Sequence, residues 1–356
     1  MKRPAYAAAS LALALIAFVP GQIGGRSFRS DISASGREWA LAPEAALQVS
    51  QRPVPPQQEP RIKAQVNLVS VIASVLDKDG RPVPDLPKEA FEVFEEGVKQ
   101  QVEVFEPETQ QPLDLALMID SSLSTLKELS FERDAAARFI RQVVRPHDRL
   151  AVFEISDVVT QLAEFSSDVP RLAETVRRIE GGGGAPLYDA IVLGSQALEK
   201  RPPGRRRVLV FVTDAGETTS RAKFDDARRA ALAAGAMLYT ILINPVKSEG
   251  GRNTAGEHAL LTITEVTGGS IYYPQDAAAL NAIFDRMDRE LRTQYRLGYY
   301  PVPRPPSRSF GTEPLFRRIE VKVKTGPAPG ATAPSVASSD SFVVRHRKGY
   351  FTPGEM

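Results

Sequence analysis

Between residues 113 and 293, short runs of apolar residues alternate with longer stretches in which apolar residues recur at helical spacing. The short runs are typical of buried strands, and the longer stretches are typical of amphipathic helices. Strands that alternate with helices predict parallel βαβ units. We therefore expect an α/β fold with a doubly wound, mostly parallel sheet in residues 109–293.

The pattern places the elements of this region approximately. The expected strands are residues 113–119, 149–156, 208–213, 236–243 and a short one at 270–273. Helices are expected at 127–144, at a stretch ending near Gly235, and at 276–292. The last helix should pack one face on the sheet, because apolar residues recur there at helical spacing: Leu280, Ile283, Phe284, Met287 and Leu291.

The segments on either side of this region have strand patterning instead. Residues 62–76 are rich in Val and Ile, residues 77–80 (DKDG) predict a turn, and residues 91–107 predict a hairpin around Gly97. Three further strands are expected after the helical region, at residues 295–300, 316–324 and 341–351. Neither segment has enough strands for a core of its own. We predict that residues 61–108 and 294–352 pair in a small discontinuous β-sandwich-like unit, into which the α/β domain is inserted. Two independent β appendages are the alternative.

The N-terminus has the pattern of a targeting segment. Lys2 and Arg3 precede an apolar run over residues 5–19, which Pro20 and Gly21 close. This predicts a signal peptide in residues 1–25 and a secreted, periplasmic or cell-envelope protein. An uncleaved N-terminal anchor is the alternative, and it would be the only contact with a membrane. Residues 26–60 are rich in Ser, Gly, Gln and Pro and predict a disordered linker.

Composition narrows the classes of partner. The 356 residues include 45 basic and 43 acidic side chains, a net charge of +2, so no overall field attracts nucleic acid. The absence of cysteine excludes thiol catalysis and disulfides. Recognition must therefore depend on a local site.

Two of the predicted strands end in an acidic residue, Asp120 and Asp214. Ligands of open parallel sheets bind at the carboxyl ends of strands, where the winding direction reverses. Asp120, Ser122 and Ser124 form the pattern D-x-S-x-S, which directs alternate oxygens of one loop to a single point. Hard oxygen ligands suit Mg²⁺. The sequence therefore predicts a cation site if Asp120 and Asp214 are neighbours.

Residues 111–293 resemble the von Willebrand factor type A (VWA) domain, with its metal-ion-dependent adhesion site (MIDAS). Four positions match that site residue by residue: Asp120, Ser122, Ser124 and Asp214. The resemblance implies a binding module that holds Mg²⁺, or another divalent cation such as Mn²⁺, and a protein partner that offers an acidic side chain. Ala185 stands where the family has a threonine ligand, which implies weaker binding of the cation. The strand segments on either side resemble the acidobacterial VWFA-related family of exported proteins.

Two other functions stay open. A metal-dependent hydrolase or phosphoryl-transfer enzyme could use Asp120 as a nucleophile or a ligand, although no general base or phosphate-binding lysine is placed beside it. A metal-free structural protein with a degenerate site is the third candidate. In the loop after Asp214, Glu217 and Thr218 offer further oxygens.

Other polar positions have simpler interpretations. Serines after a strand can cap a helix. The glycines at 181–184 lack the lysine of a phosphate-binding loop, so we expect a flexible loop there. Asp189 is expected to stabilise the start of a helix. The basic run at 205–207 predicts a solvated edge of a strand. The histidines lie in separate segments, which favours surface or loop roles over a zinc site: His147, His258 and His346.

Overall fold

The structure is a computed structural model, which describes most of the chain after residue 67. The described residues are 68–107, 110–123, 125, 129–243, 254–275, 277–302, 315–324 and 342–352. The chain divides into two compact units, Met1–Ile62 and Lys63–Met356, and all described residues lie in the second. The predicted signal peptide and linker, and Ser124, lie outside the described residues. No helix of the described part is long and apolar enough to cross a membrane.

A six-stranded sheet forms the centre of the α/β domain, with the strand order β10-β9-β8-β5-β6-β7 in the described residues. Its strands are β5 (Leu113–Asp120), β6 (Arg149–Ile155), β7 (Val159–Ser166), β8 (Arg206–Thr213), β9 (Ala236–Leu242) and β10 (Ile271–Tyr272). All neighbouring pairs are parallel except β6 and β7. The predicted fold class is confirmed.

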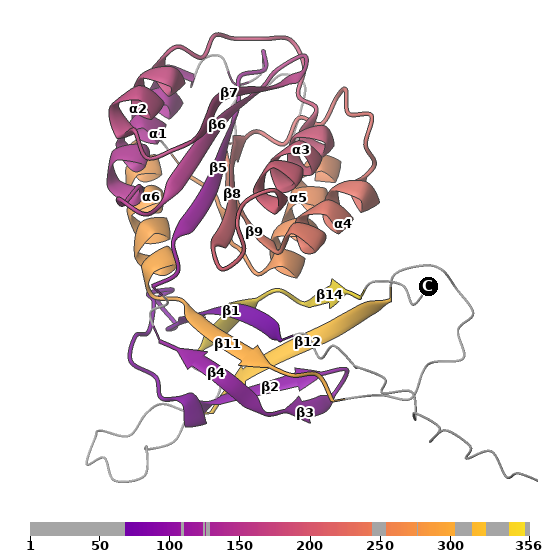
Figure 1. Cartoon of the computed structure of the whole chain (residues 1–356). Coiled ribbons are helices and arrows are strands. Elements are labelled where there is room, and N and C mark those ends of the chain that lie inside the picture. Colours follow the sequence, from indigo (N-terminus) through magenta and orange to yellow (C-terminus); the bar gives the residue numbers. More distant parts are fainter. Residues whose placement is uncertain are drawn as a thin grey trace, which may run out of the picture. The chain divides into compact units, whose positions relative to one another are not determined.

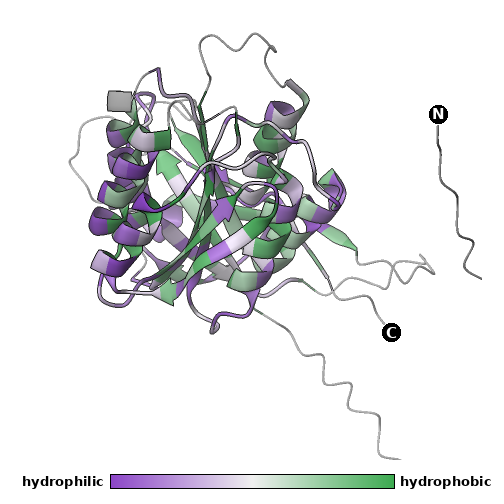
Figure 2. Ribbon diagram, turned by 90° about the horizontal axis from the view of Figure 1, so that it is seen from above, coloured by the Kyte–Doolittle hydropathy of each residue, from purple (hydrophilic) through white to green (hydrophobic). Residues whose placement is uncertain are grey.

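Helices cover both faces of this sheet (Figure 1). One face packs against α1 (Leu129–Val143), α2 (Val169–Arg177) and α6 (Ala277–Arg292). The other face packs against α3 (Leu187–Glu199), α4 (Phe224–Ala234) and α5 (Thr254–Thr267). Figure 2 shows the apolar strands enclosed by helices whose outer surfaces are polar. The prediction for α6 is confirmed: Leu280, Phe284, Met287 and Leu291 are buried, and Ile283 packs beside them.

The flanking segments form two further sheets of four strands each in the described residues, ordered β13-β1-β11-β4 and β14-β12-β2-β3. The N-terminal segment supplies β1 (Val69–Leu76), the short 3-10 helix η1 (Lys88–Ala90), β2 (Phe91–Glu95), β3 (Val98–Gln100) and β4 (Val102–Glu106). The C-terminal segment supplies β11 (Tyr295–Tyr299), β12 (Phe316–Val323), β13 (Val343–His346) and β14 (Gly349–Phe351). The two segments pair with each other, because β1 is antiparallel to β11 and β2 is antiparallel to β12.

The two small sheets share one hydrophobic core, which includes Val71, Val93, Tyr295 and Val321. The chain passes from one sheet to the other several times, for example between β3 and β4 and between β13 and β14. The single strand predicted for residues 341–351 is therefore wrong, since this stretch contributes one strand to each sheet. The predicted hairpin is confirmed in β2 and β3, and Gly97 allows it with a φ of 79°. The predicted turn before β2 is confirmed by a hydrogen bond from the Gly80 amide to the Asp77 carbonyl (2.9 Å).

One of the three histidines corrects the prediction of surface or loop roles. His147 and His258 are exposed, but His346 is buried with 2% of its surface accessible. Its Nε2 accepts a hydrogen bond from the Val321 amide (3.1 Å), and its Nδ1 donates to the Arg347 carbonyl (2.8 Å). These contacts require the neutral ring, and burial lowers the pKa of His346 to about 4. His346 thus connects β13 to β12 across the sandwich.

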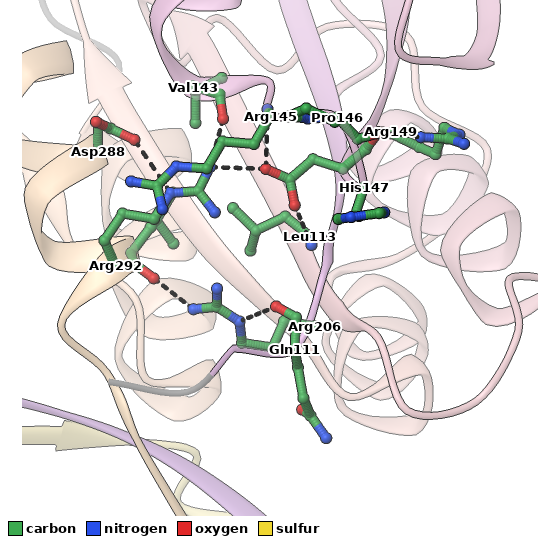
Figure 3. A network of polar contacts seen from close by, with 12 residues as sticks. Gln111, Leu113, Val143, Arg145, Pro146, His147, Arg149, Arg206, Asp288 and Arg292 are labelled. Atoms are coloured by element: carbon green, nitrogen blue, oxygen red, sulfur yellow. Dashed lines mark hydrogen bonds and ion pairs between the residues drawn. The ribbon is translucent and has the colours of Figure 1, made fainter. Parts of the chain in front are cut away.

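The arginines at 205–207 also contradict the prediction, because they do not form a solvated edge. Arg206 is buried and donates to the carbonyl of Gln111 (3.1 Å) and to Gln294 Oε1 (3.0 Å), and burial lowers its pKa to about 10. Arg205 forms an ion pair with the buried Asp114 (2.8 Å). Figure 3 shows Arg206 and Arg292 in this network at the amino end of the sheet. The partners come from distant segments, which the local sequence pattern does not reveal.

Candidate metal centre

Asp120 and Asp214 lie at the same end of two adjacent strands. The parallel register pairs Ile119 of β5 with Val212 of β8, so Asp120 lies beside Thr213, and Asp214 is the next residue. The chain continues from β5 to β6 on one side and from β8 to β9 on the other. The winding therefore reverses between β5 and β8, at the position where open α/β sheets bind ligands.

Asp120 is completely buried and accepts hydrogen bonds from uncharged donors. Its Oδ1 accepts from the Ser122 amide (2.9 Å), and its Oδ2 accepts from the Thr213 hydroxyl (2.6 Å). Burial, with a smaller contribution from the Asp214 carboxylate, raises the pKa of Asp120 to about 6, against the hydrogen bonds from Thr213 and Ser122. No basic side chain is among these influences. The negative charge of Asp120 is therefore not balanced by the described residues around it.

Thr213 contributes to the candidate metal centre, and the sequence analysis did not identify it. Its hydroxyl donates to Asp120 and also accepts a hydrogen bond from the Ala215 amide (3.0 Å), so it fixes both the strand end and the loop after it. Asp214 is partly exposed, and its Oδ1 accepts from the Gly216 amide (2.9 Å). The sequence did contain a signal for Thr213, since it is the polar residue that ends the apolar run at 208–213.

The hydroxyls after β5 have separate uses. The Ser121 hydroxyl donates to Glu154 (2.9 Å), and the Thr125 hydroxyl donates to the carbonyls of Asp120 and Ser122 (both 3.0 Å), so these two side chains hold the loop together. The Ser122 hydroxyl instead faces the Asp120 carboxylate. Helix capping thus does not account for Ser122.

The glycine-rich loop at 181–184 packs tightly between its neighbours. A Cβ on Gly182 would lie 2.3 Å from that of Ser156, and one on Gly183 would lie 2.5 Å from Asp157 Oδ1. The Gly182 amide donates to the Ser121 carbonyl (2.8 Å), and the Gly184 amide donates to Asp157 (3.0 Å). These amides are engaged within the protein, which argues against a phosphate-binding role.

The residues next to Asp214 stabilise local structure. Glu217 Oε2 accepts from the Tyr188 amide (3.1 Å) at the start of α3, and the Thr218 hydroxyl accepts from the Ala185 amide (2.9 Å). The Ala185 side chain is buried in the core, with 1% of its surface exposed. Asp189 lies in the first turn of α3, as predicted, and its carboxylate accepts from the Ala222 amide of a neighbouring loop (2.8 Å).

The donor set fits a hard cation that retains several waters. Within the described residues, no group of three or more His, Cys, Asp or Glu side chains could hold a metal. A cation beside Asp120 would therefore need hydroxyl and water oxygens as well, and these are ligands that Mg²⁺ accepts. A buried carboxylate with a second carboxylate beside it and no basic partner is the feature that favours such an ion.

Comparison with known protein families gives a match within the α/β domain. A family model described as the von Willebrand factor type A domain matches residues 115–217, which include both aspartates. No curated protein matched the chain.

Three solved structures illustrate the similarity. BatB from Bacteroides thetaiotaomicron has 16% identity over 50% of this chain and 98% of its own, with a TM-score of 0.41. The von Willebrand factor type A protein from Catenulispora acidiphila has 11% identity over 72% of this chain and 70% of its own, with a TM-score of 0.45. The von Willebrand factor domain of the pilus tip protein Mfa5 from Porphyromonas gingivalis has 12% identity over 51% of this chain and 95% of its own, with a TM-score of 0.42.

Proposed function

We propose that this chain, which contains a von Willebrand factor type A domain, is a non-catalytic protein that binds a protein partner through a divalent cation. Asp120, Ser122 and Ser124 hold the cation, and Asp214 holds waters bound to it. The cation is Mg²⁺ or Mn²⁺, and when bound it supplies a positive charge that attracts an acidic side chain of the partner. The apolar N-terminal segment supports a location outside the cytoplasm.

The observation that carries this proposal is the uncompensated charge of Asp120. Its carboxylate is buried beside Asp214, and its contacts with the described residues are with hydroxyl and amide donors. Two neighbouring carboxylates repel each other unless a cation lies between or beside them. Since two carboxylates face the ion and one acts through water, the ion keeps enough positive charge to bind a third carboxylate from outside.

Ala185 lowers the affinity for the cation without removing the site. A threonine there would offer an oxygen, whereas the Ala185 methyl group packs in the core. Mg²⁺ usually keeps several waters in protein sites, so a water can occupy the position that a threonine would fill. We therefore expect a cation that exchanges readily with solvent.

We propose binding rather than catalysis because, among the described residues, no histidine base lies beside Asp120. A hydrolase at this position would need a general base within hydrogen-bonding reach of its nucleophile or water. The described histidines lie elsewhere: His147 and His258 are exposed in other segments, and His346 lies in the sandwich. Hydrolysis of phosphate or carboxylate esters that disappears in Asp120→Asn would contradict this part of the proposal.

Thermal unfolding of the full chain in increasing MgCl₂ or MnCl₂ tests the cation. Ligand at about 100 times its dissociation constant stabilises a protein by about 2.7 kcal/mol, so the melting temperature of the wild type should rise by several degrees. Asp120→Asn should not respond. Asp134→Asn is the matched control, because this carboxylate is exposed on α1 and loses the same charge. An equal rise in the wild type and Asp120→Asn would sink the proposal.

A further inference from the structure

The three most exposed large apolar side chains of the described residues lie near the candidate metal centre. The exposed fractions are 67% for Leu123, 65% for Val158 and 58% for Phe131. Every other exposed large apolar side chain in the described residues is 54% exposed or less. We call Leu123, Val158 and Phe131 the apolar rim.

Hydrogen bonds place the rim at the carboxyl end of the sheet. Leu123 follows Ser122 directly, and the same loop is tied to the end of β6 by a bond from the Ser121 amide to the Ile155 carbonyl (2.9 Å). Val158 lies in the turn that leaves β6, where the Ser156 amide donates to the Val158 carbonyl (3.2 Å). The loop and the turn that carry Leu123 and Val158 therefore lie at the same end of the sheet as Asp120.

Phe131 belongs to the same end of the domain. It lies in the first turn of α1, and the Leu129 amide of that turn donates to the Thr125 carbonyl of the loop after β5 (3.1 Å). Leu129 of this turn packs inward, whereas Phe131 is exposed. Single exposed apolar residues are common on protein surfaces. The grouping of the three most exposed ones around one polar site is what indicates a contact surface.

We propose that the apolar rim binds apolar side chains that flank the acidic residue of the partner. This inference rests on the proposed function, and it specifies the partner as a protein segment in which one acidic residue has aliphatic or aromatic neighbours. Asp157 is exposed next to Val158, so a second acidic residue on that side would be repelled. A highly charged polyanion would meet an apolar surface where it needs basic side chains, and it does not fit.

Two capped peptides probe this specificity on the full chain. One has the sequence Gly-Leu-Asp-Leu-Gly and the other Gly-Ser-Asp-Ser-Gly, so that they differ only in the residues beside the acid. Ligand-observed NMR titration in MgCl₂, with a chelator in a parallel sample, measures millimolar affinities. We expect the leucine peptide to bind about tenfold more tightly, because burial of an aliphatic side chain contributes about 1.5 kcal/mol. Chelation should abolish the binding of both peptides.

Variants of the rim separate its contribution from that of the cation. Leu123→Ser combined with Val158→Ser should bring the affinity for the leucine peptide down to that for the serine peptide, and leave the serine peptide unaffected. Leu193→Ser is the matched control, because Leu193 is an exposed leucine on α3 outside the rim. The substituted side chains are exposed, so the melting temperature should stay within about 2 °C of the wild type.

The outcomes of these titrations distinguish the apolar rim from the proposed cation site. Equal affinity of the wild type for both peptides, or a rim variant that weakens both peptides alike, would overturn the rim and leave the cation proposal standing. Failure of the serine peptide to show any Mg²⁺-dependent binding would overturn the proposed function instead. Binding of the leucine peptide that persists in chelator would likewise count against the cation and in favour of a purely apolar surface.

Discussion

At the amino end of the central sheet, buried carboxylates are paired with arginines, whereas the buried carboxylate at the carboxyl end has no such partner in the described part of the chain. Asp114 accepts from Arg205 (2.8 Å), and Asp148 accepts from Arg292 (2.7 Å). Asp120, which is equally buried, has hydroxyl and amide donors and a second carboxylate nearby. The same chain thus balances buried charge with its own cations at one end and leaves it unbalanced at the other.

This difference separates a structural role from a binding role. A buried ion pair whose partners come from the same chain is complete and offers nothing to a ligand. A buried carboxylate without a cation raises the free energy of the protein alone, and a bound ion lowers it. The amino end therefore connects strands and helices, and the carboxyl end is the part of the domain suited to bind a cation.

The largest expected effect comes from breaking a pair at the amino end. Asp148 accepts from the Leu113 amide (2.7 Å) and the Arg145 amide (3.1 Å) as well as from Arg292. Asp148→Ala should lower the free energy of unfolding by about 3–5 kcal/mol, because it leaves two amides without their acceptor and leaves the largely buried Arg292 with the more distant Asp288 (3.5 Å) as its carboxylate. Urea denaturation in chelator measures the change, with Asp134→Ala as the exposed control. A loss below about 1 kcal/mol would show that the pair does not stabilise this end.

His346 represents a third way to bury an ionisable group, which is to keep it neutral. Its pKa falls to about 4 in the fold because of burial, so the unfolded chain binds a proton more readily below about pH 6.5. Stability is full above that pH and should fall as the pH drops toward 4, by about 3 kcal/mol in total.

Urea denaturation of the wild type and His346→Gln between pH 7 and pH 4.5 measures this effect. The variant should lose less stability than the wild type over the same interval, since glutamine does not take up a proton. Parallel pH profiles of the two proteins would show that His346 is not buried in its neutral form.

At the carboxyl end, replacing a buried aspartate should raise the free energy of unfolding, whereas at the amino end it should lower it. Asp120→Asn removes an unbalanced buried charge and keeps an oxygen that can accept from the Ser122 amide. In chelator we expect the free energy of unfolding to rise by about 2 kcal/mol, against a fall for Asp148→Asn at the other end. A loss of stability in Asp120→Asn comparable to that in Asp148→Asn would remove the distinction between the two ends.

The central fold could be predicted from the sequence because its signals are local. Strand and helix periods alternate along residues 113–293, and that alternation indicates a parallel sheet wherever it occurs. Strand β7 and helices α2 and α5 were not predicted, and α3 was expected only as a helix start at Asp189. The side chains of β7 are half-buried or exposed along the edge of the sheet, so the strand lacks an apolar pattern. The division of residues 341–351 between two sheets depends on partners far away in the chain.

The candidate site was predictable in part for the same reason. Asp120 and Asp214 each end an apolar run, and the reversal of winding between β5 and β8 makes them neighbours. The structure adds what the spacing of residues does not contain: the described residues around Asp120 include a second carboxylate and no basic partner. The amino-end arginines were misjudged because adjacent basic residues suggest a solvated surface. Arg206 nevertheless donates to carbonyls of Gln111 and Leu291, which lie far from it in the sequence.

Glu217 should have the smallest effect on stability. It also tests which carboxylates at the carboxyl end are structural and which take part in binding the cation. It follows Asp214 closely, yet its carboxylate accepts from the amides of Tyr188 (3.1 Å) and Ser220 (2.9 Å), so it acts like a cap of α3. Glu217→Ala should lower the free energy of unfolding by about 1 kcal/mol, the usual cost of losing a helix cap. Calorimetric titration should find the Mg²⁺ affinity of this variant unchanged.

Glu217→Gln is the control, because it keeps an acceptor oxygen. If Glu217→Ala and Glu217→Gln both weakened Mg²⁺ binding about tenfold, the carboxylate would be a part of the cation site, and the division drawn here between Asp120 and its neighbours would be wrong.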